Sequence, residues 1–242
     1  MKEKLIIDKE NQYNFPVGEK YATCPLCSAS RKKSTQKCVM LDWDRALATC
    51  QHCGEVMQIH TYKRADKKKK YILPPQDNLY ANITGLSDNI VKWFASRKIS
   101  QFTLQKMKIT ESVEYMPQWE KPVQTINFNY LRNGEVVNIK YRAKLKAFKM
   151  FKDAEKIMYN VDMIAASRDV VIVEGEMDCL SVVECGILHC VSVPNGATVG
   201  NINLDYLDNS IEYFENKDKI ILALDNDPPG ENLVSILVIM DI

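Results

Sequence analysis

Residues 170–178 read Val-Val-Ile-Val-Glu-Gly-Glu-Met-Asp, a short β-branched apolar run that ends in three closely spaced acids. Such a run is typical of a buried central strand, and Gly175 permits a sharp turn into a following helix. Clustered carboxylates at the end of a buried strand are costly unless a cation joins them. Because ligands bind at the carboxyl ends of parallel strands, the three carboxylates of Glu174, Glu176 and Asp178 indicate a bound cation at this end of the strand.

A second stretch has the same form. Residues 219–227 read Lys-Ile-Ile-Leu-Ala-Leu-Asp-Asn-Asp, again an apolar strand that ends in acids. Asp225 and Asp227 are two residues apart, so they point to one side of an extended chain. Two such strands side by side would bring Glu174, Asp225 and Asp227 together, and oxygen ligands of this kind suit Mg²⁺ or Mn²⁺. The alternative is two ordinary strands with solvated acidic ends.

Composition indicates a globular protein with one large or two modest domains, since the chain has 242 residues of which 46% are hydrophobic. The net charge of +1 conceals an asymmetry, because residues 156–242 carry 4 basic and 15 acidic side chains. The N-terminal part of the chain is basic and the C-terminal part is acidic. This division favours binding of a polyanion by the first part and of a metal ion by the second. No signal-peptide core and no apolar run of membrane-spanning length are present, so no membrane partner is expected.

Four of the eight cysteines form two Cys-x-x-Cys pairs. Cys24 and Cys27 are separated by 22 residues from Cys50 and Cys53. Four thiolates in tetrahedral geometry make a closed structural Zn²⁺ site, and metal is the favoured use of such pairs in a cytosolic protein. We therefore predict a small all-β zinc ribbon over residues 1–60.

The ribbon should contain strands at residues 34–40 and 46–49 around a turn at 41–45. Its basic residues, together with Trp43, suit single-stranded nucleic acid, where charge follows phosphate and a ring stacks on a base. Trp43 could equally belong to the core of the ribbon.

Residues 61–78 contain four consecutive lysines and then Pro74 and Pro75, which is typical of a basic linker. Residues 79–165 are predicted to form a basic subdomain that begins with two helices. The helices are expected at 87–98, capped by Ser87, and at 100–107, capped by Ser100.

A β-hairpin follows, with strands at residues 123–130 and 135–142 around the Asn-Gly turn at 133–134. The second strand alternates apolar and polar side chains, so one face should be buried and the other should face phosphate. Lys140 and Arg142 lie on that second face, and Lys146 and Lys149 extend it.

Residues 166–242 alternate strands with helices. Helices are expected at 176–185 and 204–214, and strands at 190–193 and 220–224 besides the first strand. Short connections with right-handed crossovers give a parallel sheet. The predicted fold class is therefore an α/β sheet domain preceded by the all-β ribbon.

These residues carry a family resemblance. Glu174-Gly175 after an apolar strand, with Asp225-Asn226-Asp227 about fifty residues later, resembles the TOPRIM domain of primases, topoisomerases and some nucleases. The ribbon ahead of it, the loop at 192–197 and the stretch at 158–160 narrow the resemblance to the primase half of bacteriophage primase–helicases.

The resemblance implies a DNA primase that makes short RNA primers from ribonucleoside triphosphates on a single-stranded DNA template. It also implies a replicative helicase, fused or separate, in the cytoplasm of a bacterial or phage-infected cell, near the nucleoid. The implied zinc ligands are Cys24, Cys27, Cys50 and Cys53, and the catalytic acids are Glu174, Asp225 and Asp227, with Asp178 a further metal ligand. The implied nucleotide- or template-binding residues are Lys140, Arg142, Lys146, Lys149, Asn195 and Trp43.

Two departures from the family pattern bear on this interpretation. No phosphate loop of a helicase motor is present, and the chain ends soon after an apolar stretch at 233–240, so we expect a truncated TOPRIM subdomain at 166–242. The alternatives are a non-catalytic zinc-finger and TOPRIM module of recombination or helicase loading, an accessory domain that lost priming, and a TOPRIM nuclease or topoisomerase. A topoisomerase would need a nucleophilic tyrosine in a further domain, and none is evident.

Overall fold

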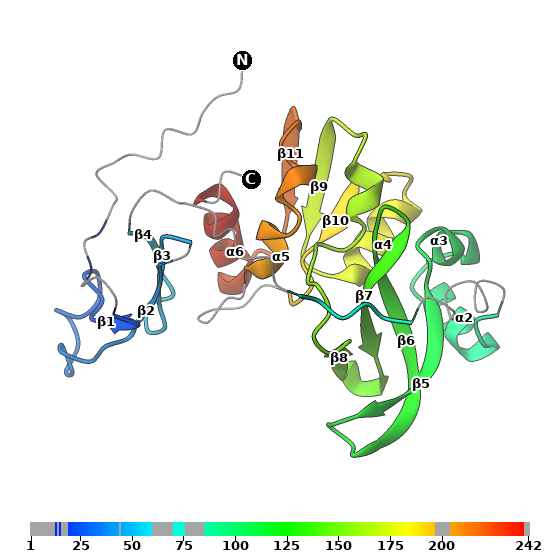
Figure 1. Ribbon diagram of the computed structural model, residues 1–242, viewed down its shortest axis with the longest axis horizontal. Helices are drawn as coiled ribbons and strands as arrows, with labels where there is room; N and C mark the ends of the chain where they lie inside the picture. Colours follow the sequence, from blue (N-terminus) through cyan, green and yellow to red (C-terminus); the bar gives the residue numbers. More distant parts are fainter. Residues whose placement is uncertain are drawn as a thin grey trace. The chain divides into compact units, whose positions relative to one another are not determined.

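The computed structural model describes residues 13, 15, 19–43, 45–59, 70–75, 85–196 and 204–239. Most of the predicted linker at 61–78 lies outside these residues. The chain divides into two compact units, whose elements are labelled in Figure 1. The ribbon unit comprises residues 1–69, 197–204 and 224–242, and the sheet unit comprises residues 70–196 and 205–223.

The ribbon unit contains an antiparallel sheet in the order β1-β2-β3-β4. Its strands are β1 (Tyr21–Ala22), β2 (Val39–Asp42), β3 (Leu47–Cys50) and β4 (Val56–Gln58). The expected ribbon is thus confirmed, but β2 begins at Val39 and not at residue 34. Residues 32–37 are polar and exposed, so that stretch has no apolar face to bury against a neighbouring strand.

Helix α6 (Pro228–Ile239) belongs to the same unit and packs against β4. Leu233, Ile236 and Leu237 are buried. The helix begins where Asp227 accepts the backbone N–H of Gly230 at 2.9 Å, which is the bond of an N-cap residue.

The first sheet of the sheet unit is antiparallel, in the order β5-β6-β7-β8. Its strands are β5 (Thr110–Met116), β6 (Lys121–Arg132), β7 (Glu135–Arg142) and β8 (Phe148–Met150). The predicted hairpin is confirmed, and positive φ at Asn133 (53°) and Gly134 (79°) is the geometry of a type I′ turn. The outer strands were not predicted, because β5 is mostly polar and β8 has three residues.

Two short helices, α2 (Asp88–Ala95) and α3 (Gln101–Lys106), precede this sheet. The Ser100 hydroxyl accepts the N–H of Thr103 at 3.3 Å, so the predicted cap of α3 is confirmed. Ser87 is the N-cap residue of α2 as predicted, but its side chain makes no capping hydrogen bond. Its hydroxyl is turned toward β5 and donates to Glu111 at 2.9 Å.

The second sheet is parallel, in the order β10-β9-β11. It contains β9 (Asp169–Val173), β10 (Cys190–Ser192) and β11 (Lys219–Ala223), and α4 (Glu176–Glu184) connects β9 to β10. Val173 pairs with Ser192 on one side and with Ala223 on the other, so β9 is the central strand as expected.

The helix expected at 204–214 is wrong, since α5 (Asp205–Asp208) and a 3₁₀ turn at Ile211–Tyr213 replace it. The break has a side-chain cause. The Asn209 amide donates to the Lys156 carbonyl at 2.8 Å, and the Ser210 hydroxyl accepts the N–H of Met158 at 2.9 Å. Both residues therefore hold a neighbouring segment instead of continuing a helix.

An aromatic cluster joins the two sheets of this unit. Phe128 and Tyr130 of β6 are fully buried and meet Tyr159 edge-on, with ring centroids 6.1 and 5.2 Å away. Tyr159 donates its backbone N–H to Ser192 of β10 at 2.9 Å. The antiparallel sheet is thereby held in place beside the carboxyl ends of the parallel strands.

None of the helices that the structure describes is both long and apolar enough to cross a membrane.

Asp162 should anchor the hairpin turn, because its carboxylate accepts the backbone N–H groups of Asn133 and Gly134, each at 2.8 Å. Asp162→Ala removes two charge-assisted hydrogen bonds, so we expect the free energy of unfolding to fall by about 1–3 kcal/mol. Thermal unfolding measures the change, with Asp169→Ala at the exposed start of β9 as a control. Equal melting temperatures of the two variants would contradict the assignment.

Candidate functional site

A cleft of about 530 Å³ lies in the sheet unit at the carboxyl end of β9, facing β7 and β8. The predicted site residues that line it are Lys140, Arg142, Lys146, Lys149, Glu174, Asp178 and Asn195. Acids from the parallel sheet therefore face cations from the antiparallel sheet across one cavity. The acids can attract a metal ion, and the cations can attract a phosphate.

The acidic wall is built around Gly175. Glu174 is half-buried directly after β9, and Asp178 is exposed in the first turn of α4. Gly175 has φ of −141°, which any residue can adopt, so the turn itself does not require glycine. A Cβ at this position would lie 3.1 Å from Asp178 Oδ2, a tight contact that the Asp178 side chain would have to relieve by a small shift. Glycine therefore leaves the Asp178 carboxylate room beside the backbone.

Asp225 and Asp227 follow β11, whose last residue, Ala223, pairs with Val173 of β9. Glu174 is one residue beyond its strand and Asp225 is two beyond its own, so both leave the same edge of the sheet. Asp225 and Asp227 are exposed and belong to the ribbon unit. That Asp225 and Asp227 bind the same metal ion as Glu174 stays a prediction, which rests on the pairing of β9 with β11.

Lys140 is not placed as expected. The face of β7 that carries it was predicted to be open, but Asn138 and Lys140 are only 1% and 9% exposed. The ammonium lies 2.9 Å from each carboxylate oxygen of Glu176 and 2.6 Å from the carbonyl of Pro194. Burial is possible because these partners satisfy the charge. Nucleotide binding by Lys140 stays a prediction.

Glu176 was not among the predicted site residues, although it lines the cleft and is 4% exposed. The Tyr130 hydroxyl donates a hydrogen bond to Glu176 Oε1. Burial, reinforced by the charge of Glu176, raises the pKa of Tyr130 well above its ordinary value, so Tyr130 is a neutral donor. The resulting network of Tyr130, Glu176, Lys140 and Pro194 ties β6 and β7 to the start of α4. No sequence signal separates Glu176 from its two acidic neighbours.

The remaining cations differ in what they contact. Lys149 pairs with Glu114 at 3.0 Å, whereas neither Arg142 nor Lys146 is paired with an acid anywhere in the described part of the chain. The Arg142 guanidinium lies 5.2 Å from the ring centroid of Phe148. Burial, together with the charge of Arg97, lowers the pKa of Arg142. These two cations are the ones most available to a phosphate.

Trp43 lies in the ribbon unit, half-buried against the ribbon core, with its indole N–H donating to the Glu19 carbonyl at 2.6 Å. This packing favours the core interpretation of Trp43. A contact between Trp43 and template stays a prediction, as does one by Asn195, which is exposed at the edge of the cleft.

The four predicted cysteine ligands come together. The sulfur atoms of Cys24, Cys27, Cys50 and Cys53 all lie within 4.8 Å of one another, and the pairs Cys24–Cys53 and Cys27–Cys50 are each 3.8 Å apart. A tetrahedron with Zn–S bonds of about 2.3 Å has edges of about 3.8 Å. Burial also raises the pKa of the Cys53 thiol to about 11, so a bound cation is needed to hold it as a thiolate. The donor set fits structural zinc.

Cys38 is a fifth sulfur beside this group. Its Sγ lies 3.6 Å from Cys50 Sγ and accepts a hydrogen bond from Arg31 at 3.1 Å. It is buried just before β2 and is a packed residue outside the group of four.

Comparison with known proteins finds similarity to a known domain in the last third of the chain. The sequence profile of the Toprim domain matches residues 168–237. The chain is 35% identical over 159 residues to a protein of Arabidopsis thaliana named "Primase homolog protein", covering 61% of this chain and 45% of that protein. It is also 34% identical over 157 residues to "Twinkle homolog protein, chloroplastic/mitochondrial" of the same plant. This match covers 60% of this chain and 21% of that protein. The chain therefore spans less than half the length of either relative.

Two solved structures share the fold across most of the chain. The primase fragment of the bacteriophage T7 primase-helicase protein covers 89% of this chain and 82% of its own, with a TM-score of 0.50 and 21% identity. The match to the Aquifex aeolicus primase, with its zinc-binding and RNA polymerase domains, covers 96% of this chain and 72% of that structure. Its TM-score is 0.51 and the sequences are 12% identical. The expected combination of a zinc ribbon and a TOPRIM-type sheet is confirmed.

We expect the purified protein to contain about one tightly bound zinc ion per chain. Cys50→Ser should lose that zinc and unfold the ribbon, because the hairpin has little core of its own. Cys38→Ser is the matched control and should keep the metal. Zinc content measured by mass spectrometry checks both variants, and equal zinc in the two would contradict the four-cysteine assignment.

The buried ion pair predicts non-additive stability. Lys140→Met leaves the Glu176 carboxylate buried without its cation, so we expect a loss of about 3–5 kcal/mol. Adding Glu176→Leu removes the stranded charge, so the double variant should be more stable than Lys140→Met alone. Urea unfolding followed by tryptophan fluorescence measures the cycle. Additive losses would show that the two side chains do not stabilise each other.

Proposed function

We propose that this chain, which carries a Toprim domain behind a four-cysteine ribbon, is a DNA primase that synthesises short RNA primers on single-stranded DNA. The observation that carries the proposal is the cleft in the sheet unit, where Glu174 and Asp178 face Arg142 and Lys146. A nucleotidyl transfer needs both walls, since carboxylates hold divalent metal and cations neutralise the triphosphate. The names of the relatives, a primase homologue and a phage primase fragment, support the same reaction.

The acids and the cations of the cleft have separate roles in this reaction. Glu174 is the general base, or the acid nearest the metal, for the primer 3′-hydroxyl, and Asp178, Asp225 and Asp227 bind Mg²⁺ or Mn²⁺ with it. The bound metal would stabilise the attacking and leaving oxygens. Arg142 and Lys146 bind the phosphates of the incoming ribonucleotide, and Asn195 contacts the nucleotide from the edge of the cleft. Lys149 can reach phosphate only by sharing its pair with Glu114.

Lys140 has a positioning role here besides any contact with nucleotide. Its ammonium holds Glu176 and the Pro194 carbonyl, and Glu176 begins the helix that follows Glu174. The ion pair therefore sets where the acidic wall stands relative to β7.

The ribbon, residues 1–60, is proposed to hold structural zinc and to select the start site on the template, with Trp43 as a stacking surface. A replicative helicase, fused or separate, is the proposed partner, because the T7 relative is named a primase-helicase protein. The setting proposed for the protein is replicating DNA in a bacterial or phage-infected cell.

A primer-synthesis assay tests the proposal. Labelled ribonucleoside triphosphates, Mg²⁺ or Mn²⁺, and heat-denatured plasmid DNA, which offers every short start sequence, should yield short RNA products. Glu174→Gln and Asp225→Asn should each reduce the yield at least about 100-fold, because each removes a carboxylate from the metal site. Chelation of divalent metal should abolish it.

Asp218→Asn is the matched control, since Asp218 lies at the opposite end of β11, exposed and paired with Arg168. Its yield should equal that of the unchanged protein. Absence of RNA from zinc-loaded protein with either metal would refute the proposal. Degradation of the DNA in place of synthesis would indicate a TOPRIM nuclease.

A further inference from the structure

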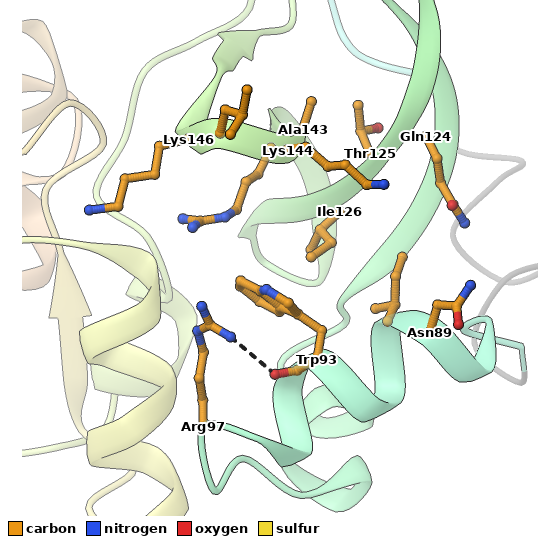
Figure 2. Close-up of a pocket in the computed structure, with 12 residues that line it drawn as sticks. Asn89, Trp93, Arg97, Gln124, Thr125, Ile126, Ala143, Lys144 and Lys146 are labelled. Atoms are coloured by element: carbon orange, nitrogen blue, oxygen red, sulfur yellow. Dashed lines mark hydrogen bonds between the residues drawn. The ribbon is translucent and has the colours of Figure 1, made fainter.

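A second cavity, of about 460 Å³, lies in the sheet unit between α2 and the turn that follows β7. In Figure 2, Trp93 of α2 and Arg97, just after that helix, lie on one side, while Lys144 and Lys146 come from the turn opposite. Apolar side chains of Ile90, Ile126 and Leu145 line the cavity around the Trp93 indole. The function proposed above uses Arg142 and Lys146, which also line this cavity, but it gives the cavity itself no role.

Its charge is of one sign. Arg97, Arg142, Lys144 and Lys146 line the cavity, and its described lining contains no aspartate or glutamate. The Arg97 guanidinium lies 3.8 Å from the Trp93 ring centroid and donates to the Trp93 carbonyl at 3.2 Å (Figure 2), while the Arg142 guanidinium lies 5.1 Å from the same ring. No acid in the described residues forms an ion pair with either arginine.

Two guanidinium groups beside one indole repel each other, and the charge of Arg97 adds to burial in lowering the pKa of Arg142. Such an arrangement is costly unless an anion lies between the cations. The flat faces of guanidinium and indole groups are also surfaces on which a nucleobase stacks. The chemistry that fits is therefore a phosphate joined to a planar base.

The turn that closes the cavity is strained. Leu145 has φ of 56° and ψ of 30°, and Lys146 follows with φ of 55°, so two successive residues with side chains adopt the left-handed conformation. Leu145 is also 90% exposed. A strained backbone that presents an apolar side chain to solvent destabilises the free protein in two ways, which is typical of a contact made only when ligand binds.

We propose that this cavity binds one nucleotide of the single-stranded DNA template, with its base stacked between Trp93 and Leu145 and its flanking phosphates on Arg97 and Lys144, beside Arg142. The inference rests on the proposed function and deepens it. A strand fits better than a nucleoside triphosphate, because a triphosphate arrives with a metal ion and this cavity offers no carboxylate to hold one. Arg142 and Lys146 also line the catalytic cleft, so the template would pass from this cavity to the acids.

Fluorescence anisotropy with a labelled oligodeoxythymidine of about 12 nucleotides tests the stacking contact. Trp93→Ala should weaken binding about 5- to 100-fold, the usual range for loss of one stacked base, and Trp93→Phe should weaken it less. Arg97→Ala should weaken binding and reduce the slope of log affinity against log salt by about 0.7, the value of one phosphate contact. Lys92→Ala, an equal charge change on the exposed side of α2, is the control and should leave affinity within about twofold.

Leu145→Gly separates binding from folding. Glycine adopts the left-handed conformation without strain, so the melting temperature should not fall, whereas the affinity for the oligonucleotide should drop several-fold. An unchanged affinity would overturn the role of Leu145.

A parallel titration with ATP and Mg²⁺ distinguishes the two sources of a base. Trp93→Ala should leave ATP binding unchanged. If the variant instead lost ATP binding and kept its affinity for the oligonucleotide, the cavity would be reassigned to the free nucleotide. Oligonucleotide affinity unchanged in both Trp93→Ala and Arg97→Ala would overturn the inference, whatever the priming assay gives. Oligonucleotide binding that depends on Trp93 in a protein unable to prime would sustain it while the proposed function fails.

Discussion

The buried ion pair between Lys140 and Glu176 is the interaction on which the rest of the sheet unit depends. It joins β7 to the first turn of α4, and Tyr130 on β6 completes it from the other side of the carboxylate. A buried charge pair of this kind is rarely a gain in stability over apolar packing, but it is intolerant of any other arrangement. Its value here is therefore positional, since it holds the antiparallel sheet at a set place beside the acids that follow β9.

This constraint divides the acids at the start of α4 into two kinds. Glu176 is buried, fully engaged and structural, whereas Glu174 and Asp178 face the cleft. A similar division applies to the cations, because Lys140 and Lys149 are paired with acids while Arg142 and Lys146 have no acidic partner in the described part of the chain. Lys140 and Arg142 lie on the same face of β7, so the partners on neighbouring elements, and not alternation along the strand, decide which of them can meet a ligand.

The same sheet supports two cavities of different chemistry that share Arg142 and Lys146. One contains carboxylates and suits a metal with a triphosphate. The other has cations beside an indole and no acid in its described lining, and it suits a strand of nucleic acid. A template-directed polymerase needs both, placed side by side, so that a template base and an incoming nucleotide can meet. The strained turn at Leu145 and Lys146 lies where the two cavities adjoin.

By itself, the sequence determined the local features of this protein. Cysteine spacing was enough for the zinc ribbon, the Asn-Gly turn for the hairpin, and apolar runs that end in acids for the central strand, because each depends on residues close together in the chain. Only the tertiary structure decided that Lys140 is buried, that Glu176 and not Glu174 is its partner, and that Asn209 and Ser210 break a helix to hold the segment at 156–158. Only the tertiary structure also brought Trp93 and Arg97 beside Arg142, across nearly fifty residues of chain. The physical reason is that burial and pairing are properties of contacts between distant segments, and no local pattern specifies which of several similar charges will find a partner.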